Sequence, residues 1–385
     1  MRIGIIGTGL TKFGEHWEKG LRDLAVEAGA QAIGEADVHG KDIQAFYGGN
    51  MSAGRFVGQE HVAAMMADRA GLTPAPAVRV EAACASGGLA VREAYLAIRS
   101  GEYDCVMVVG AEKMTDVYSE DAATTLGGAS DQEWEVFFGA TFPAIYAMMA
   151  RRHMYDYGTT EEQMAAVAVK NHKNGALNPI AQHPFEITVE QVMKSSKVAS
   201  PLKLLDCSPI TDGAAAVVLA SEKFIEEHNL DPVWIIGSAQ ASDTLALHNR
   251  KSLTELRATK IAAEKAYLQA GIKSSGVDVA EVHDCFTIAE IMAVEDLGFV
   301  EKGKGGKAVE NGEFDLNSRI SVNTSGGLKA CGHPVGATGV KQVVEIVNQL
   351  NGKCDKRQVK KAETGLAHNV GGSGATCVIN IFRRD

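Results

Sequence analysis

Short runs of apolar residues rich in Val, Ile and Ala alternate along this chain with longer stretches whose apolar residues recur every three or four positions. The runs are typical of β-strands covered on both faces, and the longer stretches are typical of helices with one buried face. This alternation predicts a layered α/β protein. The predicted strands are residues 3–6, 78–83, 105–109, 214–220, 233–237, 277–282 and 376–382, and the predicted helices include 89–98, 254–270 and 340–350.

Residues 113–207 interrupt this alternation with a polar segment rich in Met and aromatic residues. Inside it, Thr160 and Gln163 have the spacing of a capping box and Asn174-Gly175 is a stop signal, which predicts a helix from Glu161 to Lys173. We interpret the segment as an insertion that covers a site. Its Met and aromatic residues are also explained by a small core of its own.

The parts of the chain on either side of this segment resemble one another. Residues 78–112 read as strand, small-residue turn, helix and strand, and residues 320–382 repeat that order. We therefore predict two α/β halves: residues 1–222, which include 113–207 as a loop domain, and residues 223–385. A binding crevice is expected where the two halves meet.

Composition narrows the class of protein. The chain has 385 residues, of which 45% are apolar and 22% charged, as in soluble globular proteins. It contains no run of about 18 uncharged apolar residues, and its seven cysteines are scattered without a disulfide pattern, so we expect a cytoplasmic protein with no membrane association and with free thiols. A net charge of -10 argues against nucleic acid as the main partner.

The amino terminus contains part of a dinucleotide-binding fingerprint. Gly7-x-Gly9 follows a predicted strand, but Lys12 stands where the third glycine of G-x-G-x-x-G belongs. We interpret this segment as an ordinary strand and turn.

Four short segments carry residues suited to chemistry at an acyl thioester. "EAACASGG" presents Cys84, which by itself is as well explained as a buried core residue, and "EVHDCF" presents His283 and Cys285. "GGLKACGHPVGATG" places His333 in a glycine-rich turn, and "LAHNVGGSGA" offers backbone N–H groups around Gly371 and Gly372 that could stabilise an oxyanion. As a nucleophile, Cys84 would need its thiol pKa of about 8.5 lowered by a helix N-terminus or by a histidine.

In this order, the four segments, together with "GTGLTKFG" and "SPITDGAAAVVLAS", resemble the thiolase superfamily over essentially the whole chain. The sequence is most similar to sterol-carrier-protein-type thiolases and archaeal acetyl-CoA acetyltransferases. The resemblance implies duplicated α/β halves in a layered αβαβα arrangement with a covering insertion.

The resemblance also implies a role for each candidate residue. Cys84 would be the acylated nucleophile and His333 would activate it. Cys285 would donate and accept protons, and His283 with His333 would form a first oxyanion site. The backbone N–H groups of Cys84 and Gly371 would form a second.

Ser208 matches the family position that contacts the pantetheine of coenzyme A. One departure concerns the carboxyl-terminal C-x-G segment of the commonest thiolases, which reads Asn369-Val370-Gly371 here. Cys285 then supplies the acid/base thiol, and His368 has no assigned role. The candidates to face the coenzyme A phosphates are the cations of the insertion, each of which is explained at least as well as a solvated surface residue: Arg151, Arg152, Lys194, Lys197 and Lys203.

The implied reaction is a ping-pong Claisen condensation of two acetyl-CoA molecules to acetoacetyl-CoA and coenzyme A, with thiolysis as its reverse. The thioesters are substrates, and no further cofactor or metal is expected. In resembling archaeal proteins this reaction supplies the mevalonate route to isoprenoids. The expected assembly is a homodimer or homotetramer, and the resemblance allows a complex with hydroxymethylglutaryl-CoA synthase and a zinc-ribbon/OB-fold protein.

Several alternatives stay open. Within enzymes, the chain could be a 3-ketoacyl-CoA thiolase of acyl degradation, or a hydroxymethylglutaryl-CoA synthase with Glu81 as its acid, although Glu81 is expected to be buried in a strand. If the protein is not an enzyme, it could be a non-catalytic acyl-CoA-binding scaffold. A zinc site is the fourth alternative, with the candidate ligands His283, Cys285, Cys331 and His333.

Overall fold

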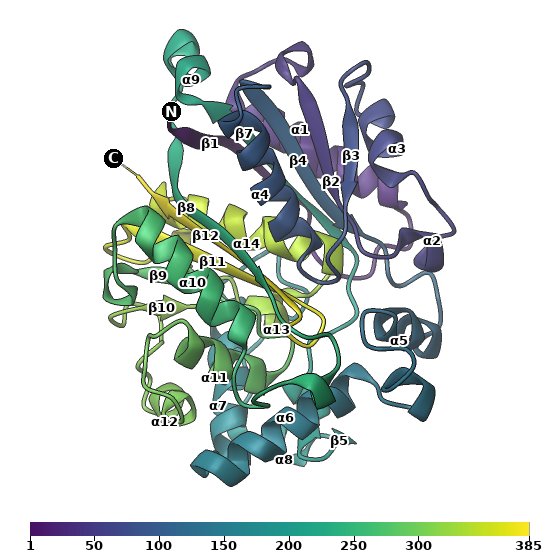
Figure 1. The fold of residues 1–385 in the computed structure, drawn as a ribbon, viewed down its shortest axis with the longest axis vertical. Helices are drawn as coiled ribbons and strands as arrows, with labels where there is room; N and C mark the ends of the chain where they lie inside the picture. The colour runs from purple at the N-terminus through teal and green to yellow at the C-terminus, as the bar shows by residue number, and fades with distance from the viewer. Residues whose placement is uncertain (385) are drawn as a thin grey trace.

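A ten-stranded mixed sheet runs through the fold in the order β10-β9-β11-β12-β8-β1-β7-β4-β2-β3 (Figure 1). The computed structural model describes residues 1–384. Five neighbouring strands come from the amino-terminal part of the chain: β1 (Ile3–Leu10), β2 (Ala45–Gly49), β3 (Ala77–Val80), β4 (Cys105–Glu112) and β7 (Gly213–Ser221). The other five come from the carboxyl-terminal part: β8 (Val233–Ser242), β9 (Val279–Glu281), β10 (Ser321–Val322), β11 (Thr364–Gly371) and β12 (Thr376–Arg383).

Two helices, α4 (Ser86–Arg99) and α14 (Val335–Leu350), lie between the two sets of strands. Their apolar residues form one core with residues of β4 and β7 on one side and of β9 and β11 on the other. Among the described residues, two pairs join the sets within the sheet: Gly4 with Trp234 and Ile5 with Val233. The two strand sets therefore enclose α4 and α14 as a central layer.

Helices also cover both outer faces. α1 (Leu21–Ala36) and α3 (Val62–Arg69) pack on the amino-terminal strands, and α10 (Arg257–Ala270) and α11 (Thr287–Asp296) pack on the carboxyl-terminal strands. The result is the predicted αβαβα layering, which the structure confirms. The remaining helices outside the insertion are α2 (Ala53–Phe56), α9 (Glu222–His228), α12 (Gly305–Glu310) and α13 (Gly327–Cys331).

The faces of β4 show why the strands read as continuous apolar runs. Cys105, Met107 and Val109 belong to the outer core, whereas Val106 and Val108 belong to the core around the central helices. Because successive side chains of a strand point to opposite faces, a strand between two helical layers needs apolar residues at every position.

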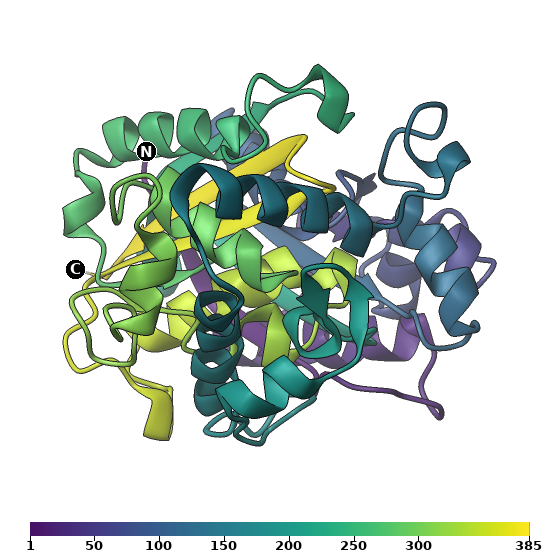
Figure 2. The same cartoon turned by 90° about the horizontal axis from the view of Figure 1, so that it is seen from below.

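Residues 113–207 form α5 (Ser119–Gly127), α6 (Phe142–Tyr157), α7 (Glu161–Gly175), α8 (Val189–Lys194) and a two-stranded sheet of β5 (Lys197–Ala199) and β6 (Leu202–Lys203). Seen from below, α6 crosses in front of the carboxyl-terminal strands (Figure 2). The predicted capping box of α7 is present, with Thr160 and Gln163 exchanging two hydrogen bonds of 3.2 Å.

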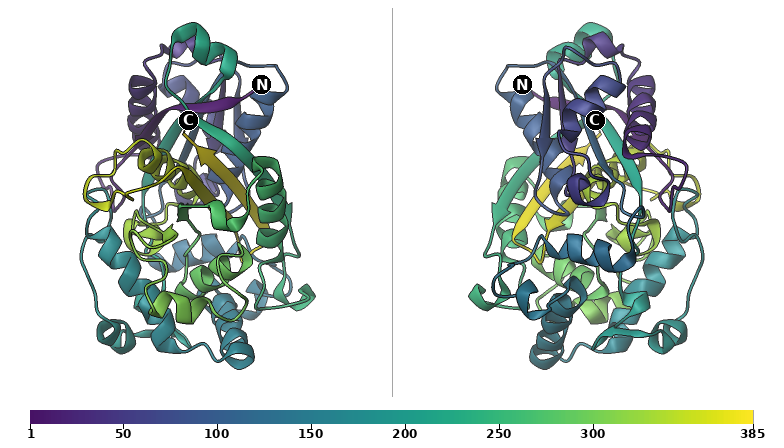
Figure 3. Two further views of the ribbon diagram at one scale, coloured as in Figure 1. Left: turned by 90° about the vertical axis from the view of Figure 1, so that its left-hand side faces the viewer. Right: turned by 90° about the vertical axis from the view of Figure 1, so that its right-hand side faces the viewer.

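Both views of Figure 3 place the amino-terminal strands at the top and the segment 113–207 at the bottom, with the carboxyl-terminal strands between them. The strand predicted at residues 78–83 ends at Val80, because the chain turns through Ala83, whose φ is 52°. β3 forms one edge of the sheet. Within residues 1–384, none of the helices combines the length and the apolar character needed to span a bilayer.

Candidate active site

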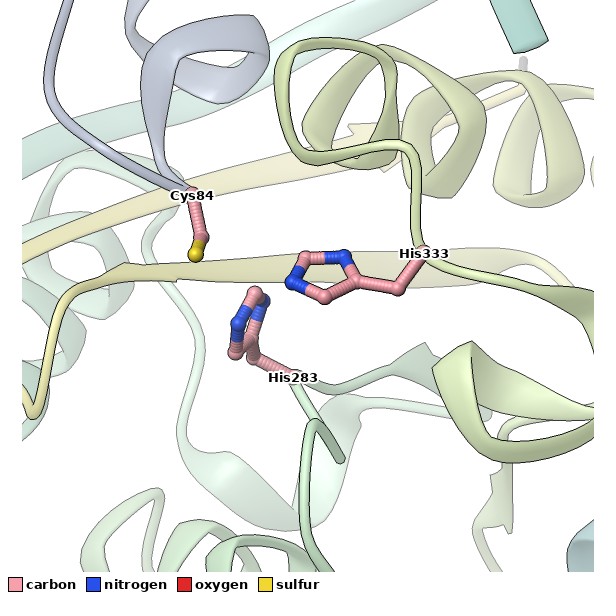
Figure 4. Close-up of side chains that lie close together, drawn as sticks. All are labelled: Cys84, His283 and His333. Atoms are coloured by element: carbon pink, nitrogen blue, oxygen red, sulfur yellow. The ribbon is translucent and has the colours of Figure 1, made fainter. Parts of the chain in front are cut away.

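Three turns from distant parts of the chain bring Cys84, His283 and His333 together (Figure 4). Cys84 precedes α4, His283 follows β9, and His333 lies between α13 and α14. One ligand atom of each residue lies within 4.8 Å of those of the other two. The imidazole rings of His283 and His333 meet edge to face, with centroids 5.1 Å apart.

Cys84 and His333 border a cavity of about 160 Å³ that reaches under the insertion. The predicted residues Cys84, Cys285, His333 and Ser208 line it, and the backbone N–H of Ser208 donates to the carbonyl of Cys285 at 3.0 Å. Most of the remaining lining is apolar and includes Met114, Leu126, Phe142, Pro143, Ile210 and Phe286. The cavity can therefore admit an apolar acyl group next to two thiols.

The glycines after Cys84 allow the central helices to approach the nucleophile turn. A Cβ on Gly87 would stand 2.6 Å from the carbonyl oxygen of Gly336 in α14, and one on Gly88 would stand 2.7 Å from Oδ1 of Asn369. Both distances are shorter than van der Waals contact. The small residues of "CASGG" thus let α4 pack against α14 and β11 with Cys84 at its start.

Cys84 is 8% exposed. Burial raises its pKa to about 12, although the N–H of Gly372 lowers this pKa by donating to the sulfur. We expected a lowered pKa for the nucleophile; in the resting protein the desolvation of the thiolate outweighs the donors around it. Acylation therefore needs a base that takes the thiol proton as the sulfur attacks.

His333 has the form of such a base. Its Nδ1 lies 2.6 Å from Oγ1 of Thr338, and that hydroxyl donates its hydrogen to the carbonyl of Pro334 at 3.0 Å. The hydroxyl must then accept from Nδ1–H, which leaves a lone pair on Nε2. Burial lowers the pKa of His333 to about 3, so the ring is neutral at pH 7.

His283 has the opposite tautomer. The side-chain amide of Asn369 is oriented because its Oδ1 accepts from the N–H of Gly88 at 3.1 Å and its Nδ2 donates to the carbonyl of Cys84 at 3.0 Å. Nδ2 also lies 3.2 Å from Nδ1 of His283, which therefore accepts. The hydrogen of His283 is on Nε2, a buried atom with no hydrogen-bond partner among the described residues.

His368, which had no predicted role, is hydrogen-bonded to the main chain of His283. Its Nδ1 accepts from the backbone N–H of His283 at 3.3 Å, and its Nε2 lies 2.9 Å from Oγ1 of Thr259. Burial lowers the pKa of His368 to about 3. His368 is thus a neutral buried residue that fixes the main chain of the catalytic turn.

Gly371 ends β11 beside the nucleophile turn, where a Cβ would stand 2.3 Å from the carbonyl oxygen of Ala82. Its role in an oxyanion site stays a prediction. Gly372, predicted with Gly371 as a backbone donor, has its N–H near the Cys84 sulfur. Sequence reasoning missed the roles of two residues of the site: Asn369, and Tyr146 in α6, which lines the cavity. The signal for Asn369 was its place in the segment that departs from C-x-G, but nothing in the Met-rich insertion distinguished Tyr146.

The four ligands of the zinc alternative are not brought together. Among residues 1–384, the close group of metal-ligand atoms contains Cys84, His283 and His333, without Cys285 or Cys331. The Cys331 sulfur is buried and accepts from Nδ2 of Asn178 at 3.7 Å.

Two further expectations were wrong. Glu81 is exposed, because β3 ends before it, and its carboxylate accepts from the N–H of Ala83 at 2.6 Å. Lys203 is buried and pairs with Glu161, so it cannot face the phosphates of a ligand. Of the other candidate cations, Arg152 pairs with Asp156 and Lys194 with Glu190, while Arg151 and Lys197 are exposed.

Known proteins are similar to this chain in sequence and in fold. Residues 3–223 match the thiolase N-terminal domain, and residues 239–384 match the thiolase C-terminal domain-like family. The chain is 55% identical to an acetyl-CoA acetyltransferase of Methanothermobacter thermautotrophicus, with 99% of each chain covered. It is 35% identical to bovine sterol carrier protein 2, covering 98% of this chain and 71% of that protein.

Among solved structures, the Ltp2-ChsH2(DUF35) aldolase superimposes with a TM-score of 0.86 at 26% identity, over 100% of this chain and 98% of the other. The sequence matches extend over both halves and the insertion, and the layered fold agrees with them. The chain therefore belongs to the thiolase family of enzymes.

Proposed function

We propose that this enzyme condenses two acetyl-CoA molecules to acetoacetyl-CoA and coenzyme A through an acetyl group on Cys84, and that it catalyses thiolysis in reverse. The observation that carries this proposal is the pair of imidazoles against the Cys84 sulfur, one with a lone pair on Nε2 and the other with a free N–H. The archaeal relative named acetyl-CoA acetyltransferase supports acetyl-CoA as the substrate.

In the first half-reaction, the Cys84 sulfur attacks the thioester carbonyl while Nε2 of His333 takes the thiol proton. The carbonyl oxygen becomes an oxyanion near the N–H groups of Cys84 and the turn at Gly371. The C–S bond to coenzyme A then breaks, and the thiol of Cys285 protonates the leaving sulfur. Acetyl-Cys84, protonated His333 and a Cys285 thiolate remain.

In the second half-reaction, the Cys285 thiolate removes a methyl proton from a second acetyl-CoA. The enolate oxygen accepts hydrogen bonds from Nε2–H of His283 and from protonated His333. The enolate carbon attacks acetyl-Cys84, and the C–S bond to Cys84 breaks. His333 returns its proton to the Cys84 sulfur, so every group regains its starting state.

Coenzyme A thioesters are the substrates in this scheme, and it needs no other cofactor. We further propose a cytoplasmic homodimer or homotetramer that serves the mevalonate route. A complex with hydroxymethylglutaryl-CoA synthase and a zinc-ribbon/OB-fold protein belongs to the same proposal. The Ltp2-ChsH2(DUF35) structure supports the idea that this fold associates with a DUF35 protein.

Mass spectrometry of the protein after incubation with acetyl-CoA tests the acyl-enzyme. We expect one acetyl adduct on Cys84 that is absent from Cys84→Ala and present in Cys105→Ala, whose buried thiol lies in β4 away from the cavity. An unmodified Cys84 would favour the non-catalytic scaffold. Comparing kcat/KM for acetoacetyl-CoA with that for longer 3-ketoacyl-CoAs separates the proposed substrate from that of a degradative thiolase.

A further inference from the structure

Tyr146 of α6 and Cys285 line the same cavity. Tyr146 is 1% exposed, and its ring packs against that of Phe286 with centroids 4.7 Å apart. Its hydroxyl donates to the carbonyl oxygen of Gly372 at 3.1 Å. The insertion thus contributes a polar group to a part of the cavity that is otherwise mostly apolar.

The acceptor of this hydrogen bond is itself held in place. Nη1 of Arg250 donates to the carbonyl of Ser373 at 2.6 Å, and Nη2 donates to its Oγ at 2.9 Å. The turn that contains Gly372 is therefore fixed by a guanidinium on one side. With its hydrogen directed to Gly372, the Tyr146 hydroxyl has a lone pair free to accept from the S–H of Cys285.

Cys285 needs such a neighbour. Burial raises its pKa well above the ordinary range, and the nearby Cys84 sulfur and the carboxylate of Asp284 raise it further. A hydrogen bond from the Tyr146 hydroxyl to the thiolate acts in the opposite direction and lowers the pKa of Cys285. The hydroxyl therefore stabilises the thiolate of Cys285 relative to its thiol.

We propose that Tyr146 is a positioning residue for proton transfer by Cys285, with a hydroxyl that accepts from the thiol and rotates away from Gly372 to donate to the thiolate. The inference rests on the proposed function of Cys285. In the proton-abstraction step, the methyl C–H bond breaks, an S–H bond forms on Cys285, and the electron pair moves to the enolate oxygen. Tyr146 keeps its own proton throughout and returns it to Gly372.

The test is exchange of the acetyl-CoA methyl protons with deuterated solvent, measured against pH for the wild-type enzyme and Tyr146→Phe. Loss of a hydrogen bond to a charged group predicts exchange slower by about tenfold to a hundredfold. It also predicts that the rising limb of the pH profile moves to higher pH. Tyr267→Phe is the matched control, because it removes a hydroxyl that donates to the carbonyl of Leu297 at 2.9 Å outside the cavity.

A second comparison separates this role from simple packing. In a Cys285→Ala background, the rate of Cys84 acetylation should be the same with Tyr or Phe at position 146, since there is no thiolate left to stabilise. The inference would be overturned if Tyr146→Phe slowed Cys84 acetylation equally in the wild-type and Cys285→Ala backgrounds. It would also be overturned if Tyr146→Phe alone left the exchange rate and its pH profile unchanged. Absence of both exchange and acetyl adduct in the wild-type protein would instead overturn the proposed function.

Discussion

Nδ2 of Asn369 lies 3.2 Å from Nδ1 of His283, and this contact decides which nitrogen of the imidazole carries its hydrogen. The same amide donates to the carbonyl of Cys84 and accepts from the N–H of Gly88. One side chain of β11 thereby ties the nucleophile turn to the histidine that faces it. By the resemblance, Asn369 stands where the commonest thiolases have the cysteine of C-x-G. That cysteine serves acid/base chemistry, whereas Asn369 orients its neighbours.

Asn369→Asp should reverse the tautomer of His283. A carboxylate accepts from Nδ1–H, which would leave a lone pair on Nε2 where the enolate needs a donor. We expect kcat to fall by about a hundredfold or more, as when one oxyanion donor is removed. Steady-state kinetics of acetoacetyl-CoA thiolysis measures this loss.

Asn380→Asp serves as the control for that substitution. Asn380 is buried in the neighbouring strand β12, where its Oδ1 accepts from the hydroxyl of Ser238 at 2.8 Å. It introduces the same charge into the sheet without touching His283. A comparable fall in kcat for both variants would show that buried charge, and not the tautomer, causes the effect.

Thr338 is expected to hold His333 as a base. Thr338→Val removes the acceptor at 2.6 Å from Nδ1, so either ring nitrogen can carry the hydrogen. We expect the acetylation of Cys84 to slow by about tenfold or more. Rapid-quench mass spectrometry measures this rate. Thr338→Ser retains the hydroxyl and should stay close to the wild-type rate; an equally slow serine variant would contradict this role.

The buried ion pair of Lys341 and Glu281 should matter for stability. Nζ of Lys341 lies 2.9 Å from the carboxylate, and both side chains are at most 1% exposed. Lys341→Met would leave the carboxylate of Glu281 buried without its cation, which costs about 3 to 5 kcal/mol. Chemical denaturation monitored by circular dichroism measures the free energy of unfolding.

The exposed pair of Lys353 and Glu35 provides the comparison. Its lysine side chain is 53% exposed, so Lys353→Met should change the free energy of unfolding by less than about 1 kcal/mol. If both methionine variants lost the same stability, burial would not be the reason for the effect of Lys341.

Acid should destabilise the protein through its buried neutral histidines. Burial lowers the pKa of both His333 and His368 to about 3, whereas the pKa of a histidine in the unfolded chain is about 6.5. Between these values the unfolded chain binds more protons, so stability falls as the pH drops below about 6.5. Each histidine contributes a slope of up to about 1.4 kcal/mol per pH unit.

Urea unfolding at several pH values between about 7.5 and about 5 measures this slope. His368→Gln removes one titrating group and should make the dependence shallower by up to one proton. Identical slopes for the wild-type and variant proteins would show that His368 does not titrate on unfolding.

The sequence by itself determined the features that depend on local pattern. Apolar runs such as Cys105 to Val109 predicted strands between helical layers, because every position of such a strand faces a core. The helix at α7 was predicted from its capping residues, and the start of α11 at Thr287 from the change of pattern after "HDCF". Strand β11 was missed, because its buried His368 and Asn369 interrupt the apolar pattern that predicts a strand.

Only the tertiary structure decided how the site works. The amide of Asn369 bonds to residues more than 80 and more than 280 positions away, and no local pattern encodes such contacts. The pKa of Cys84 depends on how completely water is excluded around it, and the place of Tyr146 depends on how the insertion packs over the sheet. Residue types and their order reveal which chemistry is available, but tautomers, proton affinities and neighbours arise from the three-dimensional environment.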